Sequence, residues 1–270
     1  MRTGILGLLV LLGAHGAAAQ SNDVTFFVIG KHANFAHVGD DDPAPVDFSF
    51  FSEIFLTGGG DASEATLTFP TGEIQPFNDM RVAEGGDRDN LLLVSGEDRF
   101  TRGSDLTERY PDGDYTVSFA TPSGDVAALL TFQPRPLPPA PRVTVRQEGR
   151  TCDRFDAGKD LVISWSDFDT GRSDPNEILD DLIFVILTNA DGERIAHSGR
   201  PFENRPYLTY ASTEFRIDQA VLEPGASYTL SVEHALLDDT AAFDGVPGFT
   251  TRAVTTKRNV TTGDAQSGCR

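Results

Sequence analysis

Carboxylates are the side chains of this sequence whose type and spacing come nearest to a chemical site. Asp167 and Asp169 stand two residues apart, and Asp174 follows five residues later. Calcium takes six to eight oxygen ligands from carboxylates, carbonyls and water, so these three residues are candidate calcium ligands. The run begins like an EF-hand loop, but Gly171 occupies the third ligand position and no glutamate stands at the twelfth. The alternative is that the aspartates cap a loop.

A second carboxylate cluster, at positions 40–42, immediately precedes Pro43. It is another candidate for calcium, and the alternative is a solvated turn. Asp167 and Asp169 could also form an acid/base pair. With 41 acidic residues in the chain, however, such pairs arise readily by chance. Apart from this calcium hypothesis, no cofactor is expected.

Catalytic motifs are absent from the sequence. It contains no Gly-x-Ser-x-Gly elbow and no His-Glu-x-x-His helix. Gly158-Lys159 lacks the glycine spacing and the hydroxyl residue of a phosphate loop. His32 and His37 lie five residues apart, which places them on opposite faces of a strand and argues against a shared metal. We therefore predict that the protein is not an enzyme.

The sequence contains two cysteines, Cys152 and Cys269. In an oxidising compartment a pair without competitors has one intramolecular connectivity, so we predict a disulfide between them. Such a bridge would join the end of the chain to the beginning of its domain. Its Cα atoms should lie ~4.4–6.8 Å apart.

The first nineteen residues predict export. Arg2 provides a positive charge, residues 5–12 form an apolar run, and Ala17-Ala18-Ala19 fits a cleavage site. Residues 1–19 are therefore expected to be a signal peptide, with the mature chain beginning at Gln20. No later segment is long and apolar enough to be expected to span a membrane. The predicted location is secreted or periplasmic.

Negative charge is concentrated in the first half of the chain. Residues 20–133 carry 20 acidic and 6 basic side chains, a balance of −14, whereas residues 134–270 carry 21 and 15, a balance of −6. Nucleic acids and anionic lipid surfaces would be repelled by such a field, so both are poor candidates as partners.

Short strand-like segments fill the chain and predict an all-β fold. Five prolines in residues 134–141 cannot join a central sheet and indicate a semi-rigid linker. This segment separates two predicted β-sandwich domains, residues 20–133 and 142–270. Each half contains about seven short strand-like runs, the number that a sandwich of this type requires.

A repeated motif connects the two halves. Pro111 precedes Tyr115 by four residues, Pro224 precedes Tyr228 by four, and Thr and Ser follow each tyrosine at the same offsets. This spacing fits a tyrosine corner, in which the ring packs on the core and the hydroxyl bonds to upstream backbone. Together with Trp165 on an early strand, the motif resembles fibronectin type III domains in poorly characterised exported bacterial proteins. An immunoglobulin-like sandwich is the alternative, and the resemblance implies no chemistry.

We therefore expect a non-catalytic binding or structural module whose partner is an unknown protein or polysaccharide. The loops at the ends of such sandwiches are the usual contact surfaces. The main alternative is an accessory, polysaccharide-binding component of a secreted hydrolase system. A secreted enzyme is the third possibility.

Overall fold

A computed structural model describes residues 23–37, 42–80, 91–95, 99–202 and 206–270. The expected signal peptide at 1–19 and the aspartates at positions 40 and 41 lie outside the described residues. In the first half, the elements are β1 Val24–Ala36, β2 Ala44–Leu56, β3 Ser63–Thr68, β4 Ile74–Pro76, β5 Asn78–Asp79, β6 Leu91–Ser95, α1 Gly103–Arg109, β7 Gly113–Thr121 and β8 Gly124–Phe132. In the second half, they are β9 Val143–Arg146, β10 Phe155–Asp156, β11 Leu161–Trp165, β12 Leu182–Thr188, β13 Arg194–His197, β14 Leu208–Thr209, β15 Glu214–Ile217, the 3₁₀ turn η1 Gln219–Val221, β16 Ser227–Phe243 and β17 Val246–Gly263.

The prediction of an all-β fold is confirmed, and each half pairs its strands in the same order. In the first half, β1, β2 and β6 face a sheet of order β4-β3-β7-β8. In the second half, β9, β11 and β15 face the run β13-β12-β16-β17. Taken in chain order, β1 therefore corresponds to β9, β2 to β11, β7 to β16 and β8 to β17. The expected resemblance to fibronectin-type-III-like and immunoglobulin-like sandwiches holds in both halves.

The two tyrosine corners lie on corresponding strands. Tyr115 on β7 is fully buried and donates its hydroxyl proton to the Pro111 carbonyl at 2.8 Å. Tyr228 on β16 is 4% exposed, and its hydroxyl accepts the Glu223 N–H at 2.7 Å. Each ring thus fixes the turn that precedes its own strand, as the repeated motif predicted.

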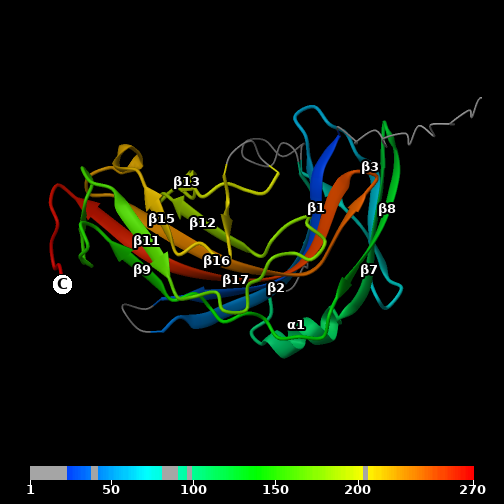
Figure 1. Cartoon of the computed structure of the whole chain (residues 1–270), viewed down its shortest axis with the longest axis horizontal. Coiled ribbons are helices and arrows are strands. Elements are labelled where there is room, and N and C mark those ends of the chain that lie inside the picture. Colours follow the sequence, from blue (N-terminus) through cyan, green and yellow to red (C-terminus); the bar gives the residue numbers. More distant parts are fainter. Residues whose placement is uncertain (1–22, 38–41, 81–90, 96–98, 203–205) are drawn as a thin grey trace, which may run out of the picture.

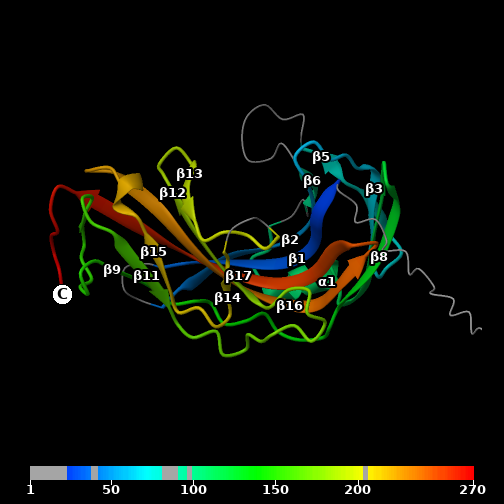
Figure 2. The same cartoon turned by 45° about the horizontal axis from the view of Figure 1, so that its top comes forward.

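One continuous sheet runs through both sandwiches. β1 pairs in parallel with β17, from Phe27 opposite Gly248 to Ala36 opposite Lys257. This pairing joins the strands in the order β13-β12-β16-β17-β1-β2-β6-β5, which we call the shared sheet. Its central strands extend along most of the molecule (Figures 1 and 2). The expected arrangement, two domains connected through residues 134–141 alone, is not confirmed, because strands from both halves hydrogen bond to each other.

Both smaller sheets cover the same face of the shared sheet. Along β17, alternate side chains point to one side, and on that side Val246 joins the first core whereas Val260 joins the second. The first core also contains Phe27 and Tyr115. We call this covered side the inner face and the opposite side the outer face.

A cluster of charged side chains lies on the inner face between the two cores. Lys31 and Arg252 are opposite each other on β1 and β17 and are only 1% and 3% exposed. Arg252 donates to Asp112 at 2.8 Å and to Asp238 at 2.7 Å, and Lys31 forms an ion pair with Asp112. Buried charges require such partners, because removing them from water is costly.

The proline-rich segment 134–141 is attached to this cluster. Arg135 forms an ion pair with Asp238 and donates to the carbonyl of Leu237 on β16. Where the segment leads into β9, Arg258 on β17 donates to the Val143 carbonyl at 2.9 Å.

Within the part of the chain that the structure describes, no helix is long and apolar enough to span a membrane.

Candidate functional site

The outer face of the shared sheet is apolar at its centre. Phe26 on β1 stacks on Phe55 of β2 with ring centroids 4.4 Å apart and lies 5.8 Å from the ring of Phe249 on β17. Val28 and Ala253 belong to the same cluster. A sheet with one solvated face usually alternates apolar and polar side chains. This face therefore differs from an ordinary solvated surface.

A groove crosses this apolar centre, which we call the aromatic groove. Its floor, formed by β1, β17 and β16, includes Phe26, Val28, Ala235 and Phe249, and it is flanked by Phe51 and Phe55 on β2 and by Phe184 on β12. The hollow has a volume of about 380 Å³. That volume lies within the ~300–1,000 Å³ of small-molecule sites, which are mostly apolar with a few polar groups.

The described parts of the loop between β13 and β14, residues 198–202 and 206–207, line part of the groove. The Arg200 guanidinium lies 5.6 Å from the ring centroid of Phe55 and 5.8 Å from that of Phe184, so it contacts both sides of the groove. Gly199 adopts φ +91°, and a Cβ there would lie 2.1 Å from the Pro206 carbonyl oxygen. The loop can therefore close on itself only with glycine at this position.

Polar side chains continue the groove along the strands, and we call this part the polar end. The Asn34 amide donates to Asp47 at 2.7 Å, and Arg99 donates to the same carboxylate at 3.1 Å. A second hollow, of about 700 Å³, is lined by these residues and shares Phe51, Glu53 and Glu233 with the aromatic groove. The two hollows thus adjoin at these three side chains, and together we call them the trough, which is more apolar at one end and more polar at the other.

The hydrogen bonds of the polar end favour binding over catalysis. Thr255 donates its proton to Glu233 at 2.9 Å, so the His32 Nε2 at 2.8 Å from the same hydroxyl must donate to it. Burial lowers the pKa of His32, with the Glu233 charge opposing the shift, so the ring is neutral near pH 7. Neutral His32 therefore holds the Thr255 hydroxyl without being placed to remove its proton.

The candidate calcium ligands have different surroundings. Asp167 and Asp169 are exposed on either side of the buried Phe168. Asp174 accepts the N–H groups of residues 176, 178 and 179 at 2.9–3.0 Å and the Thr240 hydroxyl at 2.8 Å.

Burial would raise the pKa of Asp174, but these donors hold it below its ordinary value. No three His, Cys, Asp or Glu side chains among the described residues are placed to hold a metal ion. The geometry therefore fits the loop-capping alternative, and thermal melts with calcium and with chelator remain the test of the calcium hypothesis.

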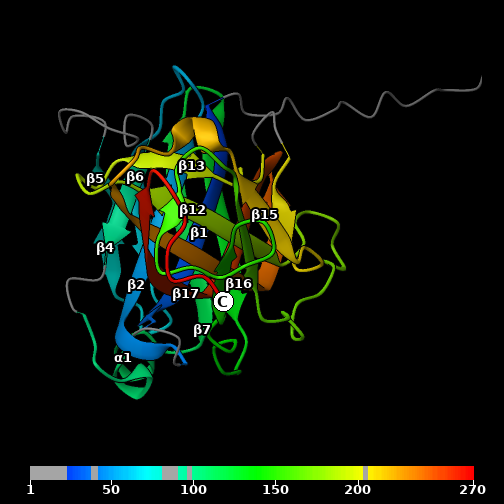
Figure 3. The same ribbon diagram turned by 90° about the vertical axis from the view of Figure 1, so that its left-hand side faces the viewer.

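The predicted disulfide is present, with Cα atoms 3.9 Å apart instead of the expected ~4.4–6.8 Å. The neighbouring residues, Thr151 and Arg270, exchange both backbone hydrogen bonds. Cys152 and Cys269 are therefore directly opposite on paired antiparallel segments, where Cα separations are shortest. The bridge attaches the C-terminal tail, which faces the viewer in Figure 3.

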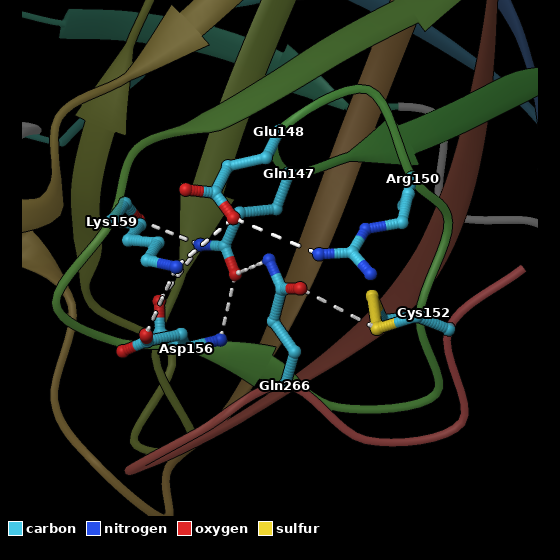
Figure 4. Close-up of a disulfide and its surroundings, with 8 residues drawn as sticks. Gln147, Glu148, Arg150, Cys152, Asp156, Lys159 and Gln266 are labelled. Carbon is cyan, nitrogen blue, oxygen red and sulfur yellow. Dashed lines mark hydrogen bonds and ion pairs between the residues drawn. A yellow bond between two sulfur atoms is a disulfide. The ribbon is translucent and has the colours of Figure 1, made fainter.

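A buried glutamine strengthens the same corner. Gln147 is fully buried, donates to the carbonyls of Asp156 and Lys159, and accepts from the Asp156 N–H and the Gln266 amide, all at 2.8–2.9 Å (Figure 4). The tail is thus held by a side-chain network as well as by the covalent bond. Both features are structural, because they stabilise a loop and present no open group to a ligand.

Sequence reasoning missed the trough, although one signal for it was available. The β2 segment carries Phe50 and Ile54 on one face and Phe51 and Phe55 on the other. A strand that is apolar on both faces is typical of a sheet covered on both sides. Phe50 belongs to the first core, whereas Phe51 and Phe55 are only partly buried on the outer face.

No family model matches the chain, and no curated protein matches it. Similar solved structures include the BSP domain of a biofilm-associated protein, at 14% identity and TM-score 0.23, covering 87% of this chain and 29% of that one. The FN1–FN3 domains of chicken CNTN1 match at 10% identity and TM-score 0.24, covering 85% and 62%. The titin domains z1z2, solved in complex with telethonin, match at 12% identity and TM-score 0.20, covering 89% and 94%. The chain thus spans less than two thirds of the first two, and at such low scores we base no functional conclusion on these likenesses.

Proposed function

We propose that the chain is a non-catalytic binding module that works outside the cytoplasm, and that its ligand binds in the trough on the outer face of the shared sheet. The observation that carries this proposal is the aromatic groove. Phe51, Phe55 and Phe184 are each only partly buried, although large apolar side chains gain most by complete burial. A ligand that covered them would complete that burial.

The location is supported by the leader-like residues 1–19 and by the disulfide. Disulfides persist in oxidising compartments and are rare in the cytosol. N-terminal sequencing of the exported protein tests this part of the proposal. A mature chain that begins at Gln20 is the expected result, and retention of the full chain in the cytoplasm would contradict it.

Partly exposed aromatic side chains are also what the polysaccharide-binding alternative requires. Phe184 and Phe55 flank the groove, and the polar end supplies hydrogen-bonding groups. This second candidate therefore concerns the same surface and differs only in the ligand.

The groove can be tested without knowing the ligand. Phe184→Glu places a charge at the side of the groove, whereas Leu129→Glu changes a side chain that is 56% exposed on β8. In a strain that lacks the gene, we expect Leu129→Glu to restore the wild-type phenotype and Phe184→Glu to fail to do so. Both variants should be exported and should melt near the wild-type temperature. Full restoration by folded Phe184→Glu would show that the groove is not the site.

A further inference from the structure

We infer that the ligand is a single-chain amphiphile with an uncharged, hydroxyl-bearing head group. Its apolar chain would lie in the aromatic groove and its head at the polar end. This inference rests on the proposed function and names the ligand of the same site.

The aromatic groove fits an alkyl chain better than a sugar ring. Its floor includes the apolar side chains of Phe26, Val28, Ala235 and Phe249, and its sides carry phenylalanines together with Arg194 and Arg200. Sugar hydroxyls placed against the side chains of Phe26, Val28, Ala235 and Phe249 would lose hydrogen bonds to water, which is costly, because these four side chains offer no partner in return. Methylene groups lose none and gain from burial.

The polar end fits the head of the same molecule because the two hollows adjoin at shared side chains. Glu233 lines both, and Asn34, Asp47 and Arg99 supply further hydrogen-bonding groups in the second hollow. An extended ligand can therefore place an apolar segment and a polar segment in the trough at once.

The charges at the polar end select an uncharged head. Asp47, Glu53 and Glu233 would repel an anion, whereas Arg99 and Lys257, which line the same hollow, would repel a cation. Hydroxyl groups avoid both conflicts, because they can donate to the carboxylates and accept from the Asn34 amide. The net charge of −19 adds to the repulsion of anionic heads.

Alkyl glucosides are the probes of choice. Calorimetry below their micelle-forming concentrations should show one molecule bound per chain. Affinity should rise about tenfold for each two methylenes added between hexyl and decyl chains. Alkyl sulfates and alkyltrimethylammonium salts of equal length should bind at least tenfold more weakly, and glucose or a glucose polymer should show no binding.

Three variants locate the site. Phe184→Glu and Ala235→Phe should each weaken decyl glucoside at least tenfold, the first through charge and the second by filling the floor. Leu129→Glu should leave the affinity unchanged. If Ala235→Phe fails to fold, Phe184→Glu still decides the matter, because its side chain is at the partly exposed side of the groove.

The inference is overturned if folded protein binds no alkyl glucoside, if the sulfate binds as tightly, or if the polymer binds without an alkyl chain. These outcomes differ from failure of the proposed function. If Phe184→Glu fails to restore the wild-type phenotype in cells but no amphiphile binds, the groove is still the binding site and the proposed ligand class is wrong. If decyl glucoside binds in the groove but Phe184→Glu restores the phenotype fully, the binding is real and the proposed function is wrong.

Discussion

Replacing Asp112 by asparagine should destabilise the protein by disturbing the charged cluster between the two cores. Asp112 is the carboxylate that both Lys31 and Arg252 contact, and those two cations are almost fully buried. Burial would raise the pKa of Asp112, but the hydrogen bonds from Lys31 and Arg252 hold it below its ordinary value. The charged form of Asp112 is therefore favoured in the folded protein, and its removal has a cost.

The size of that cost follows from what the change leaves behind. Asparagine keeps the shape and one carbonyl acceptor, but the two buried cations lose their shared anion. Breaking a buried ion pair by removing one partner costs about 3–5 kcal/mol. The Asp112 side chain is 20% exposed, so water compensates in part and we expect about 3 kcal/mol. Asp238→Asn should cost less, because burial raises the pKa of Asp238 despite its two arginine partners.

Denaturation by urea at pH 7, analysed by linear extrapolation, measures the difference. Asp125→Asn, at an exposed position on β8, is the matched control and should change stability by less than about 0.5 kcal/mol. Because the folded pKa of Asp112 lies below its ordinary value of 3.8, its contribution is complete above that pH and is lost as the pH falls through the folded pKa. The gap between wild type and Asp112→Asn should therefore narrow below about pH 4. A gap under about 1 kcal/mol at pH 7 would refute the reasoning.

Three further predictions concern stability. A Cβ at Gly248 would lie 2.1 Å from the ring of Phe27, which is fully buried and cannot move away, so Gly248→Ala should lower the free energy of unfolding by about 1–3 kcal/mol in the same urea assay. A Cβ at Gly30 would lie 2.2 Å from the ring of Phe51, which is partly exposed and can shift, so Gly30→Ala should cost clearly less. Changing both Cys152 and Cys269 to alanine should cost about 2–5 kcal/mol, because the bridge joins residues 117 apart; unchanged guanidinium midpoints would contradict this. Burial lowers the pKa of His234 to about 4, so the folded protein favours the neutral ring. The stability that this provides is complete above about pH 6.5, and up to about 3 kcal/mol of it is lost as the pH falls to 4. Melts across that range should show a weaker acid loss in His234→Phe, and parallel curves would contradict the assignment.

Local sequence patterns sufficed for the repeated elements of the fold. The spacing of Pro111 to Tyr115 and of Pro224 to Tyr228 identified two equivalent corners, because a tyrosine corner is built from residues close together in the chain. The disulfide could be predicted because Cys152 had one possible partner. Strand existence was likewise readable, whereas strand length was not: the sequence indicates short strands, but the strand that carries Tyr228, β16, is 17 residues long.

The shared sheet could not be predicted for a physical reason. Backbone hydrogen bonding between β1 and β17 produces no recognisable pattern in the sequence of either strand, because any extended segment offers the same donors and acceptors. Gly248 was the nearest signal, because it leaves room for the ring of Phe27 on β1. A glycine inside a strand indicates a close approach without identifying what approaches. The trough was missed for the same reason, as its floor exists only once β1, β17 and β16 lie side by side.

The pairing of β1 with β17 also has a consequence for the order of events during synthesis and export. β1 emerges before β17, because Gly248 follows its partner Phe27 by about 220 residues. Until β17 arrives, one edge of β1 offers unpaired backbone groups beside Phe26, the kind of edge that invites pairing with other chains. Contacts this distant in sequence also slow folding. A chain truncated before β17 should therefore aggregate even when the first sandwich is intact, and a factor that shields unfolded segments should raise the yield of the whole protein more than that of its second half.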